Sequence, residues 1–216
     1  MADKKGLFIT IEGCDGSGKT TVLNHVLSRL TKEGYKIHPT REPGGSKIAE
    51  QIRTIILDKN NIDEDVRTEA LLYAAARRQH LVDIVLPILN RGGIVVSDRY
   101  IDSSLAYQGY ARGIGIDEVY QINMFATEHK LPDMTIYFNI DPAIGLKRIS
   151  AERKEKADRL DREKLEFHQK VYKGYQEVIK KYPARFVIVE ASRPIDEVEA
   201  EVYFLLKKKF DEYLKG

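Results

Sequence analysis

The sequence has almost no cysteine, no long hydrophobic run and little net charge, and each shortage excludes a class of protein. The single cysteine, Cys14, cannot form an internal disulfide, which suits a reducing compartment, so we expect a cytoplasmic protein. No stretch approaches the roughly 18 apolar residues of a membrane span. The first apolar run, Leu7 to Ile11, is too short for the core of a signal peptide. We therefore expect no membrane partner.

The balance of charges excludes a second class. Lysine and arginine total 35 against 33 acids, and the net charge of +2 gives no general field for nucleic acid. We expect no nucleic-acid partner, so any basic function must be local. The sequence also lacks a linker rich in Pro, Gly or Ser, and 216 residues with 43% hydrophobic content suffice for one core. We expect a single domain over residues 1–216.

A phosphate-binding motif stands near the start of the chain. Gly13 to Thr20 fits G-x-x-x-x-G-K-S/T, with a strand-like apolar run before it and a helical pattern after it, as the motif requires. Glycines let successive N–H groups turn toward phosphate oxygens at the positive end of the following helix. Lys19 would reach the β- and γ-phosphates of a nucleotide, and Thr20 would bind Mg²⁺. The expected donor-binding residues of the loop are Gly13, Cys14, Asp15, Gly16, Ser17, Gly18, Lys19, Thr20 and Thr21.

Strand-like apolar runs alternate with helical patterns along the whole chain. The expected strands are Leu7 to Ile11, Tyr35 to Arg41, Ile94 to Asp98, Met134 to Ile140 and Phe186 to Val189. The expected helices begin at Thr21 and continue with Ser46 to Leu57, Val66 to Asn90, Ile101 to Tyr110, Asp117 to Glu128, Ala143 to Ser150, Glu163 to Tyr182 and a last helix opened by Pro194. This order implies parallel strands with a ligand site at their carboxyl ends. We predict an α/β fold, a P-loop NTPase three-layer α/β/α sandwich with a five-stranded parallel sheet and a lid at about 148–162.

Two features bear on metals. The β-branched run Ile94 to Asp98 ends in an acid and is typical of the Walker B strand, so Asp98 is expected to hold Mg²⁺ or its water shell. The five histidines include no pair at metal-ligand spacing on one helix, so we expect no zinc.

Two kinds of phosphate-loop protein fit these observations, a kinase for a small acceptor and a GTP-binding switch. A switch needs a guanine-reading N-K-x-D motif, which the sequence lacks. A kinase needs arginines, because donor and acceptor phosphates repel each other unless fixed cations lie between them. Six arginines fall where they would rim the cleft: Arg41, Arg53, Arg77, Arg78, Arg99 and Arg112. These arginines favour the kinase.

Three further segments carry a resemblance to a known family. They are Thr40 to Gly45 (TREPGG), Tyr73 to Arg78 (YAAARR) and Asp98 to Gly109 (DRYIDSSLAYQG). In order and spacing they resemble the thymidylate kinase family, over nearly the whole chain. The resemblance implies a homodimeric enzyme that transfers the γ-phosphate of ATP to dTMP with Mg²⁺, giving dTDP and ADP.

The resemblance also implies which residues bind the acceptor: Asp15, Glu42, Arg53, Tyr73, Arg77, Arg99, Ser104, Tyr107 and Gln108. In the family an aromatic residue at the position of Tyr73 stacks on thymine, while arginine and glutamine at the positions of Arg77 and Gln108 meet its polar edges. Many members carry Phe where this chain has Tyr73, whose hydroxyl needs a partner. Tyr107 is expected against the sugar and Asp15 near the 3′-hydroxyl.

The cations around the phosphates are assigned in the same way. The resemblance implies that Arg53 and Arg99 contact the acceptor phosphate and that Arg148 stacks on adenine. The loop carries Gly16 where one branch of the family has arginine, so the transition-state cation should come from the lid. Within the lid we expect Arg153, with Arg159 as second choice.

No dedicated base is needed, because the attacking phosphate oxygen is already anionic. The expected catalytic residues are Lys19, Asp98, Arg99 and Arg153, and the expected metal ligands are Thr20 and Asp98. A kinase for another pyrimidine monophosphate such as dUMP remains an alternative, since the methyl group that separates thymine from uracil is worth only about 1–3 kcal/mol. A non-enzymatic nucleotide switch is the more distant alternative.

Overall fold

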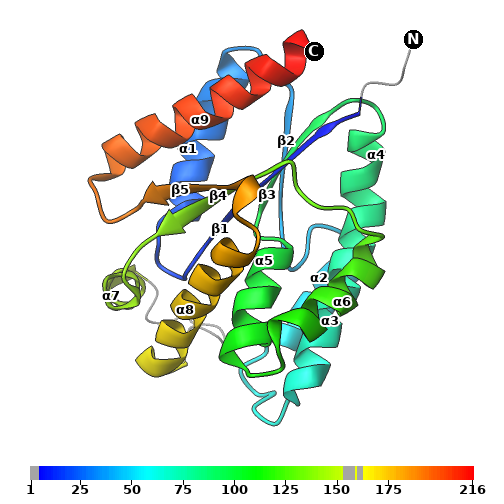
Figure 1. The fold of residues 1–216 in the computed structure, drawn as a ribbon, viewed down its shortest axis with the longest axis vertical. Helices are drawn as coiled ribbons and strands as arrows, with labels where there is room; N and C mark the ends of the chain where they lie inside the picture. Colours follow the sequence, from blue (N-terminus) through cyan, green and yellow to red (C-terminus); the bar gives the residue numbers. More distant parts are fainter. Residues whose placement is uncertain (1–4, 153–158, 160–162) are drawn as a thin grey trace.

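Five parallel strands form the centre of the computed structural model, which describes residues 5–152, 159 and 163–216 (Figure 1). The strands are β1 (Leu7–Gly13), β2 (Ile37–Arg41), β3 (Ile94–Asp98), β4 (Met134–Asn139) and β5 (Phe186–Glu190). They lie in the order β2-β3-β1-β4-β5, and every neighbouring pair is parallel. The predicted α/β fold with a five-stranded parallel sheet is confirmed.

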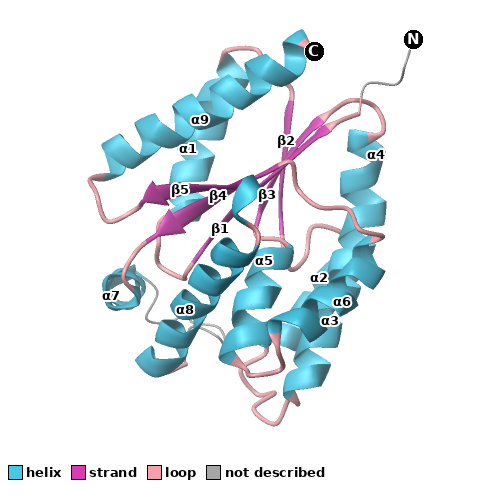
Figure 2. Cartoon of the chain, viewed as in Figure 1, coloured by secondary structure: helices cyan, strands magenta, loops and turns pink. Residues whose placement is uncertain are grey.

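Helices cover both faces of the sheet (Figure 2). Their bounds are α1 (Lys19–Lys32), α2 (Lys47–Leu57), α3 (Val66–His80), α4 (Leu86–Leu89), α5 (Ile101–Ser104), α6 (Ile116–Thr127), α7 (Pro142–Glu152), α8 (Leu165–Lys181) and α9 (Ile195–Lys215). A short 3₁₀ turn, η3 (Pro183–Arg185), precedes β5. Among the described residues no helix is long and apolar enough to cross a membrane.

Strand β1 is buried on both sides because its side chains alternate between two cores. Ile9 packs against the apolar sides of α1 and α9, whereas Phe8 packs against the layer that includes Leu81, Leu105 and Val119. Figure 1 shows α1 and α9 side by side on one face, away from α3 and α6 on the other. This double burial explains the nearly continuous apolar run of the strand.

Two of the expected helices are interrupted by π-helical turns. The segment from Val66 passes from α3 into the π-helical η1 (Leu81–Val85) before α4. The segment expected as one helix from Ile101 to Tyr110 consists of α5 followed by the π-helical η2 (Leu105–Ala111). The wider turn of a π-helix changes which side chains share a face, and such turns are frequent at functional sites. Here η2 carries Tyr107 and Gln108.

The register brings the carboxyl ends of the central strands together. Asp98 at the end of β3 pairs with Ile11 of β1 on one side and with Arg41 of β2 on the other. The loop after β1 therefore leaves from the middle of this edge, with β2 and β3 on one side and β4 and β5 on the other.

Candidate active site

A cavity of about 640 Å³ lies at the carboxyl edge of the sheet. The phosphate loop and the ends of β2 and β3 form its middle. At the β2 side its walls come from α2, α3 and η2, through Arg53, Leu57, Tyr73, Tyr107 and Gln108. At the β5 side they come from α7 and the segment after β5, through Arg148, Ala191, Arg193 and Ile195. The cavity thus has two ends that meet at the phosphate loop.

The phosphate loop is shaped by its glycines. Gly18, the residue before α1, has a φ of 83°, a conformation that residues with side chains rarely adopt. The buried Nζ of Lys19 donates to the carbonyl oxygens of Gly13 and Cys14, each at 2.9 Å, and to Ser17 Oγ at 3.2 Å. Burial, followed by repulsion from Arg99, lowers the pKa of Lys19 to about 8. The ammonium group of Lys19 is therefore bound by oxygens of the phosphate loop, and it lies where the motif predicts the phosphates of a nucleotide.

Gly16 is confined by a close neighbour. Its φ is 72°, and a Cβ at this position would overlap the backbone of Gly145 in α7. A Cβ at Gly145 would in turn come within 2.5 Å of the Asp15 carbonyl oxygen. An arginine in place of Gly16 would therefore require α7 to move away, which gives a physical reason why this chain lacks the loop arginine.

Thr20 and Asp98, both expected to bind a metal, are brought together. The Thr20 hydroxyl donates to Asp98 Oδ2 at 2.8 Å. Among the described residues there is no cluster of three or more His, Cys, Asp or Glu side chains that would form a protein cage for a metal. A hydroxyl beside one carboxylate is the donor set of a Mg²⁺ site that is completed by phosphates and water.

Arg99 is held in an unusual backbone conformation by two hydrogen bonds. Its φ of 72° is rare for a residue with a side chain. Its N–H donates to the Ile11 carbonyl oxygen at 2.9 Å, and its own carbonyl oxygen accepts from Ser97 Oγ at 2.8 Å. This geometry turns the side chain from the end of β3 into the cavity.

The guanidinium of Arg99 is bound on several sides. It lies 2.5 Å from Asp15 Oδ1 and donates to Ser103 Oγ at 3.0 Å and to the Tyr175 hydroxyl at 3.3 Å. Tyr107 donates to the other oxygen of Asp15, Oδ2, at 2.6 Å. Burial alone would raise the pKa of Asp15, but Arg99 and then Lys19 lower it below its ordinary value. Asp15 is therefore a carboxylate that ties Arg99 to Tyr107.

Beneath Arg99 lies an acid that the motifs did not reveal. Glu12 is completely buried and accepts hydrogen bonds from Ser103 Oγ at 2.6 Å and from the Tyr175 hydroxyl at 2.8 Å. Burial, and then Asp102, raises the pKa of Glu12 to about 7, although Arg99 opposes the shift. Glu12 thus orients the two hydroxyls that support Arg99. An acid at the end of an otherwise apolar strand was the one signal in the sequence for this role.

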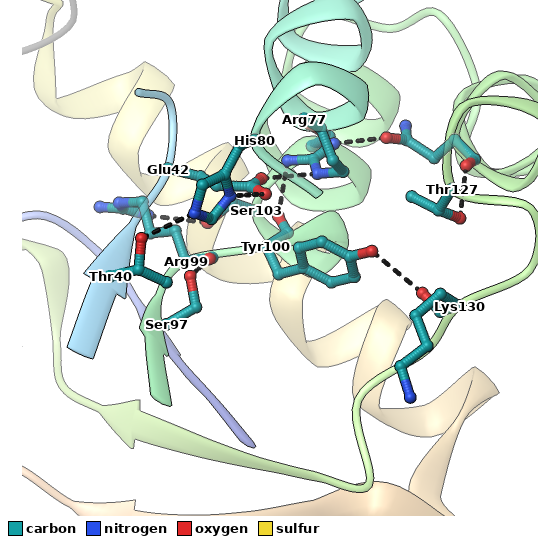
Figure 3. Close-up of polar contacts among 12 residues, drawn as sticks. Thr40, Glu42, Arg77, His80, Ser97, Arg99, Tyr100, Ser103, Thr127 and Lys130 are labelled. Atoms are coloured by element: carbon teal, nitrogen blue, oxygen red, sulfur yellow. Dashed lines mark hydrogen bonds and ion pairs between the residues drawn. The ribbon is translucent and has the colours of Figure 1, made fainter. Parts of the chain in front are cut away.

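A second buried cluster joins Glu42, Arg77 and His80 (Figure 3). Arg77 Nε lies 2.7 Å from Glu42 Oε2, and His80 Nδ1 lies 2.9 Å from Glu42 Oε1. Arg77 also donates to Ser104 Oγ at 3.0 Å, to Asn123 Oδ1 and to the Tyr100 carbonyl oxygen at 2.9 Å. His80 Nε2 lies 2.6 Å from Thr40 Oγ1.

This cluster changes what the sequence suggested for its members. Arg77 and Ser104 are each only 1% exposed and do not line the cavity, although both were expected to bind the acceptor. Glu42 does line it, but both of its oxygens are engaged by Arg77 and His80. In this structure Arg77 holds the side chains of Glu42 and Ser104 in position by hydrogen bonds and does not face the cavity.

The remaining expected acceptor residues face the cavity. Arg53 lines it and donates to the Pro43 carbonyl oxygen at 2.8 Å. Tyr73 and Gln108 line the same end, from α3 and η2. Gln108 is held from behind by Glu69, at 2.8 Å from its Nε2. Glu69 was not singled out in the sequence, where it is one acid among many at the start of a helix.

The expected lid residues fall partly outside the described part of the chain. Arg153 lies outside the described residues. Arg159 donates to the Ile56 carbonyl oxygen at 3.0 Å and contacts Glu64 and Glu69, and it does not line the cavity. This position does not support Arg159 as a cation near the phosphates. Arg148 lines the β5 end and donates to the Ala191 carbonyl oxygen at 3.4 Å.

Comparisons with known proteins place the chain in one family. A family model described as thymidylate kinase matches residues 11–202. A thymidylate kinase from Bacillus velezensis is 58% identical over 188 residues, covering 87% of this chain and 89% of that protein. One from Oceanobacillus iheyensis is 50% identical over 211 residues, covering 98% and 94%. The crystal structure of thymidylate kinase from Ehrlichia chaffeensis superposes with a TM-score of 0.75 at 33% identity, covering 94% of this chain and 99% of that one.

Proposed function

The chain belongs to the thymidylate kinase family, and from this membership we propose how its cavity divides between two nucleotides. The protein is a kinase that transfers the γ-phosphate of ATP to dTMP, giving dTDP and ADP. We place ATP at the β5 end and dTMP at the β2 end. The observation that carries this division is one cavity with the phosphate loop in its middle and a separate wall for a base at each end.

At the donor end, the N–H groups of the phosphate loop and Lys19 bind the β- and γ-phosphates. The glycine φ values and the buried Nζ of Lys19 support this role. Arg148 packs on the adenine beside Ala191, on the same wall of the cavity. Most of the contacts with the ATP phosphates are therefore expected to come from backbone N–H groups.

We propose Mg²⁺ as the cofactor, held by Thr20 and Asp98 together with phosphate oxygens. The Thr20 hydroxyl and the Asp98 carboxylate, whose oxygens lie 2.8 Å apart, are oxygen ligands that fit a hard cation that keeps several waters. When bound, Mg²⁺ neutralises charge that develops on the transferring phosphoryl group. The task of Thr20 and Asp98 is to fix its position relative to Arg99.

At the acceptor end, Arg53 and Arg99 bind the dTMP phosphate. Arg99 follows Asp98 directly at the end of β3, and its side chain lines the cavity between the two ends. Its guanidinium can therefore stabilise negative charge on the phosphoryl group as that group passes from ATP to dTMP. Transfer needs an in-line approach of two phosphates and no general base, since the attacking oxygen is already anionic. Holding both phosphates close converts an encounter of two anions into a reaction within one complex.

The base and sugar of dTMP are placed by three further residues. Tyr73 stacks on thymine, and Gln108 bonds its polar edge. Tyr107, fixed by its hydrogen bond to Asp15, faces the sugar and leaves little space for a 2′-hydroxyl. Arg77 and Ser104 act from behind the wall, where Arg77 holds Glu42 in place. The lid cation at Arg153 remains a prediction.

We also propose that the protein is a homodimer. Exposed apolar side chains lie on three helices, α2, α3 and α6, of which α3 packs against both others: Ile55, 48% exposed, Leu71, 55% exposed, and Phe125, 89% exposed. Burial of these side chains between two copies of the chain would remove them from water. A cytoplasmic location is proposed on the single buried cysteine, Cys14.

The test is ADP release from Mg-ATP with dTMP, dUMP, UMP, CMP, GMP, AMP or no acceptor, compared in parallel. We expect dTMP to lead, and turnover without an acceptor to be negligible. Equal ADP release without an acceptor would contradict kinase activity. A different leading nucleotide would leave a kinase but contradict the roles given to Tyr73, Tyr107 and Gln108.

A further inference from the structure

Glu69 is a buried acid behind the acceptor end, and the proposed function gives it no role. It lies in the first turn of α3 and is 1% exposed. Its Oε1 accepts from Gln108 Nε2 at 2.8 Å and from Arg112 Nε at 3.3 Å. Its Oε2 accepts from Arg112 Nη2 at 3.3 Å and lies 2.5 Å from Arg159 Nη2. Both oxygens are therefore occupied by donors.

The charge of Glu69 decides which way the Gln108 amide points. Burial would raise the pKa of Glu69, but Arg112, the Gln108 amide and Arg159 together lower it below its ordinary value. An ionised carboxylate only accepts hydrogen bonds, so Gln108 can face it only with its NH₂ group. The carbonyl oxygen, Oε1, is the other end of the amide and has no hydrogen bond within the described part of the chain.

Gln108 lines the cavity together with Tyr73, which follows Glu69 by one helical turn of α3. An amide held by its NH₂ group presents an acceptor to a base lying on Tyr73. Thymine and uracil carry a ring N–H that can donate to this oxygen. Cytosine has an unprotonated ring nitrogen at the equivalent position, which would face the oxygen as a second acceptor.

We propose that Glu69 is a positioning residue for acceptor selection, because it fixes the Gln108 amide with its oxygen toward the base. The inference rests on the proposed dTMP kinase function and deepens it. Glu69 makes the site selective for pyrimidines with a ring N–H, and it acts on the substrate only through Gln108.

The two arginines hold Glu69 itself in place. Arg112 also lies 2.7 Å from Glu163 and places its guanidinium 4.3 Å from the centre of the Phe167 ring. Arg159 also lies 2.6 Å from Glu64 Oε2. The carboxylate is therefore anchored by Gln108 from η2, by Arg112 just after η2 and by Arg159 from the segment before α8, so it does not turn with the substrate.

Glu69→Gln tests the proposal directly. The new amide supplies one oxygen where the carboxylate supplied two, and the charged arginines compete for it more strongly than Gln108 does. Its NH₂ group then faces Gln108, whose amide turns over and offers NH₂ to the cavity. We expect the KM for dTMP to rise about tenfold. The ratio of kcat/KM for dTMP over dCMP should fall at least tenfold, while the KM for ATP and the ratio of dTMP over dUMP stay unchanged.

Glu64→Gln is the matched control. It makes the same substitution in the other carboxylate that binds Arg159, but Glu64 does not contact Gln108. We expect its ratio of dTMP over dCMP to stay within twofold of the wild type. A Gln108→Met background adds a second check, since there Glu69→Gln should have no further effect on this ratio.

Three outcomes would overturn the proposal: an unchanged dTMP over dCMP ratio in Glu69→Gln, an equal fall in Glu64→Gln, or a further fall in the Gln108→Met background. If Glu69→Gln does not fold, the wild type still gives an answer. The NMR signals of the two Gln108 side-chain NH₂ protons are assigned by their loss in Gln108→Met. One of these protons should exchange slowly with solvent, whether or not dTMP is bound. Rapid exchange of both protons would overturn the proposal. A wild type that does not phosphorylate dTMP would instead contradict the proposed function.

Discussion

The two ends of the cavity are held in place by different means. At the end proposed for ATP, Lys19 and Arg148 bond to backbone carbonyl oxygens, and the loop proposed to bind the phosphates is itself backbone. At the acceptor end, side chains hold other side chains across long stretches of sequence: Arg99 and Asp15 are 84 residues apart, and Arg77 and Glu42 are 35 apart. A local motif thus builds the phosphate-binding part of the donor end, whereas the acceptor end depends on the whole fold. We therefore expect single side-chain substitutions at the acceptor end to impair the use of dTMP while leaving ATP binding nearly unchanged.

Arg99→Ala should break the acceptor end most severely. It removes the cation at the boundary between the two phosphates and leaves Asp15 without its arginine. We expect kcat for dTMP phosphorylation to fall by roughly 10³-fold or more, with a much smaller change in the KM for ATP. Steady-state ADP release measures both quantities. Arg99→Lys keeps the charge without the planar fork and should recover only part of the rate. A loss below tenfold in Arg99→Ala would contradict the assigned role.

Arg77→Met should destabilise the protein, because it leaves the Glu42 carboxylate buried beside His80 alone. The expected loss in the free energy of unfolding is about 3–5 kcal/mol, as for other buried pairs that lose one partner. Urea denaturation followed by circular dichroism measures it. The matched control is Arg78→Met, which removes the adjacent arginine from the exposed pair with Glu128 and should cost about 1 kcal/mol or less. Similar losses in both variants would refute the structural role of Arg77.

Glu12 should make stability depend on pH. Its pKa of about 7 in the folded protein lies above the ordinary value of 4.5, so the folded state binds the proton more tightly. Its contribution is fully present below about pH 4.5 and is lost as the pH rises through 7, a change of about 3 kcal/mol in the free energy of unfolding. Unfolding curves of the wild type and Glu12→Gln between pH 4.5 and 8 test this. Parallel pH profiles for the two proteins would show that Glu12 does not titrate in this range.

Tyr107→Phe should have the mildest effect, because it removes one hydrogen bond to Asp15 while the ring stays in place. We expect the KM for dTMP to rise about 2- to 12-fold, from a hydrogen-bond contribution of about 0.5–1.5 kcal/mol. The KM for ATP should not change, which separates the two ends of the cavity. Kinetics with dTMP and ATP varied in turn measure both constants. An equal rise in both would mean that the Asp15 contact organises the phosphate loop as a whole.

The sequence predicted the donor end and the fold more completely than the acceptor end. The phosphate loop depends on local backbone geometry, and the apolar runs of β1 and β3 reflect burial on both faces, so both can be read from short stretches. Strand β2 contains Pro39 and lies at the edge of the sheet, the place where a strand tolerates proline.

The supporting residues of the acceptor end could not be predicted in this way. Arg77 was expected in the cavity because the family resemblance implied a contact with the base, but the partners that keep it behind the wall, Glu42 and Asn123, lie on distant segments. Glu12 and Glu69 appear as ordinary acids until the fold places hydroxyls and arginines around them. Contacts between such distant segments have no local signature.

The division of one cavity between two nucleotides is tested most directly by calorimetric titration of dTMP. dTMP is titrated into the protein alone and into the protein saturated with a non-hydrolysable ATP analogue and Mg²⁺. The two-ended site predicts one dTMP per chain in both titrations, with the analogue still bound. Loss of dTMP binding in proportion to the occupancy of the analogue would contradict it, because both nucleotides would then share one end of the cavity.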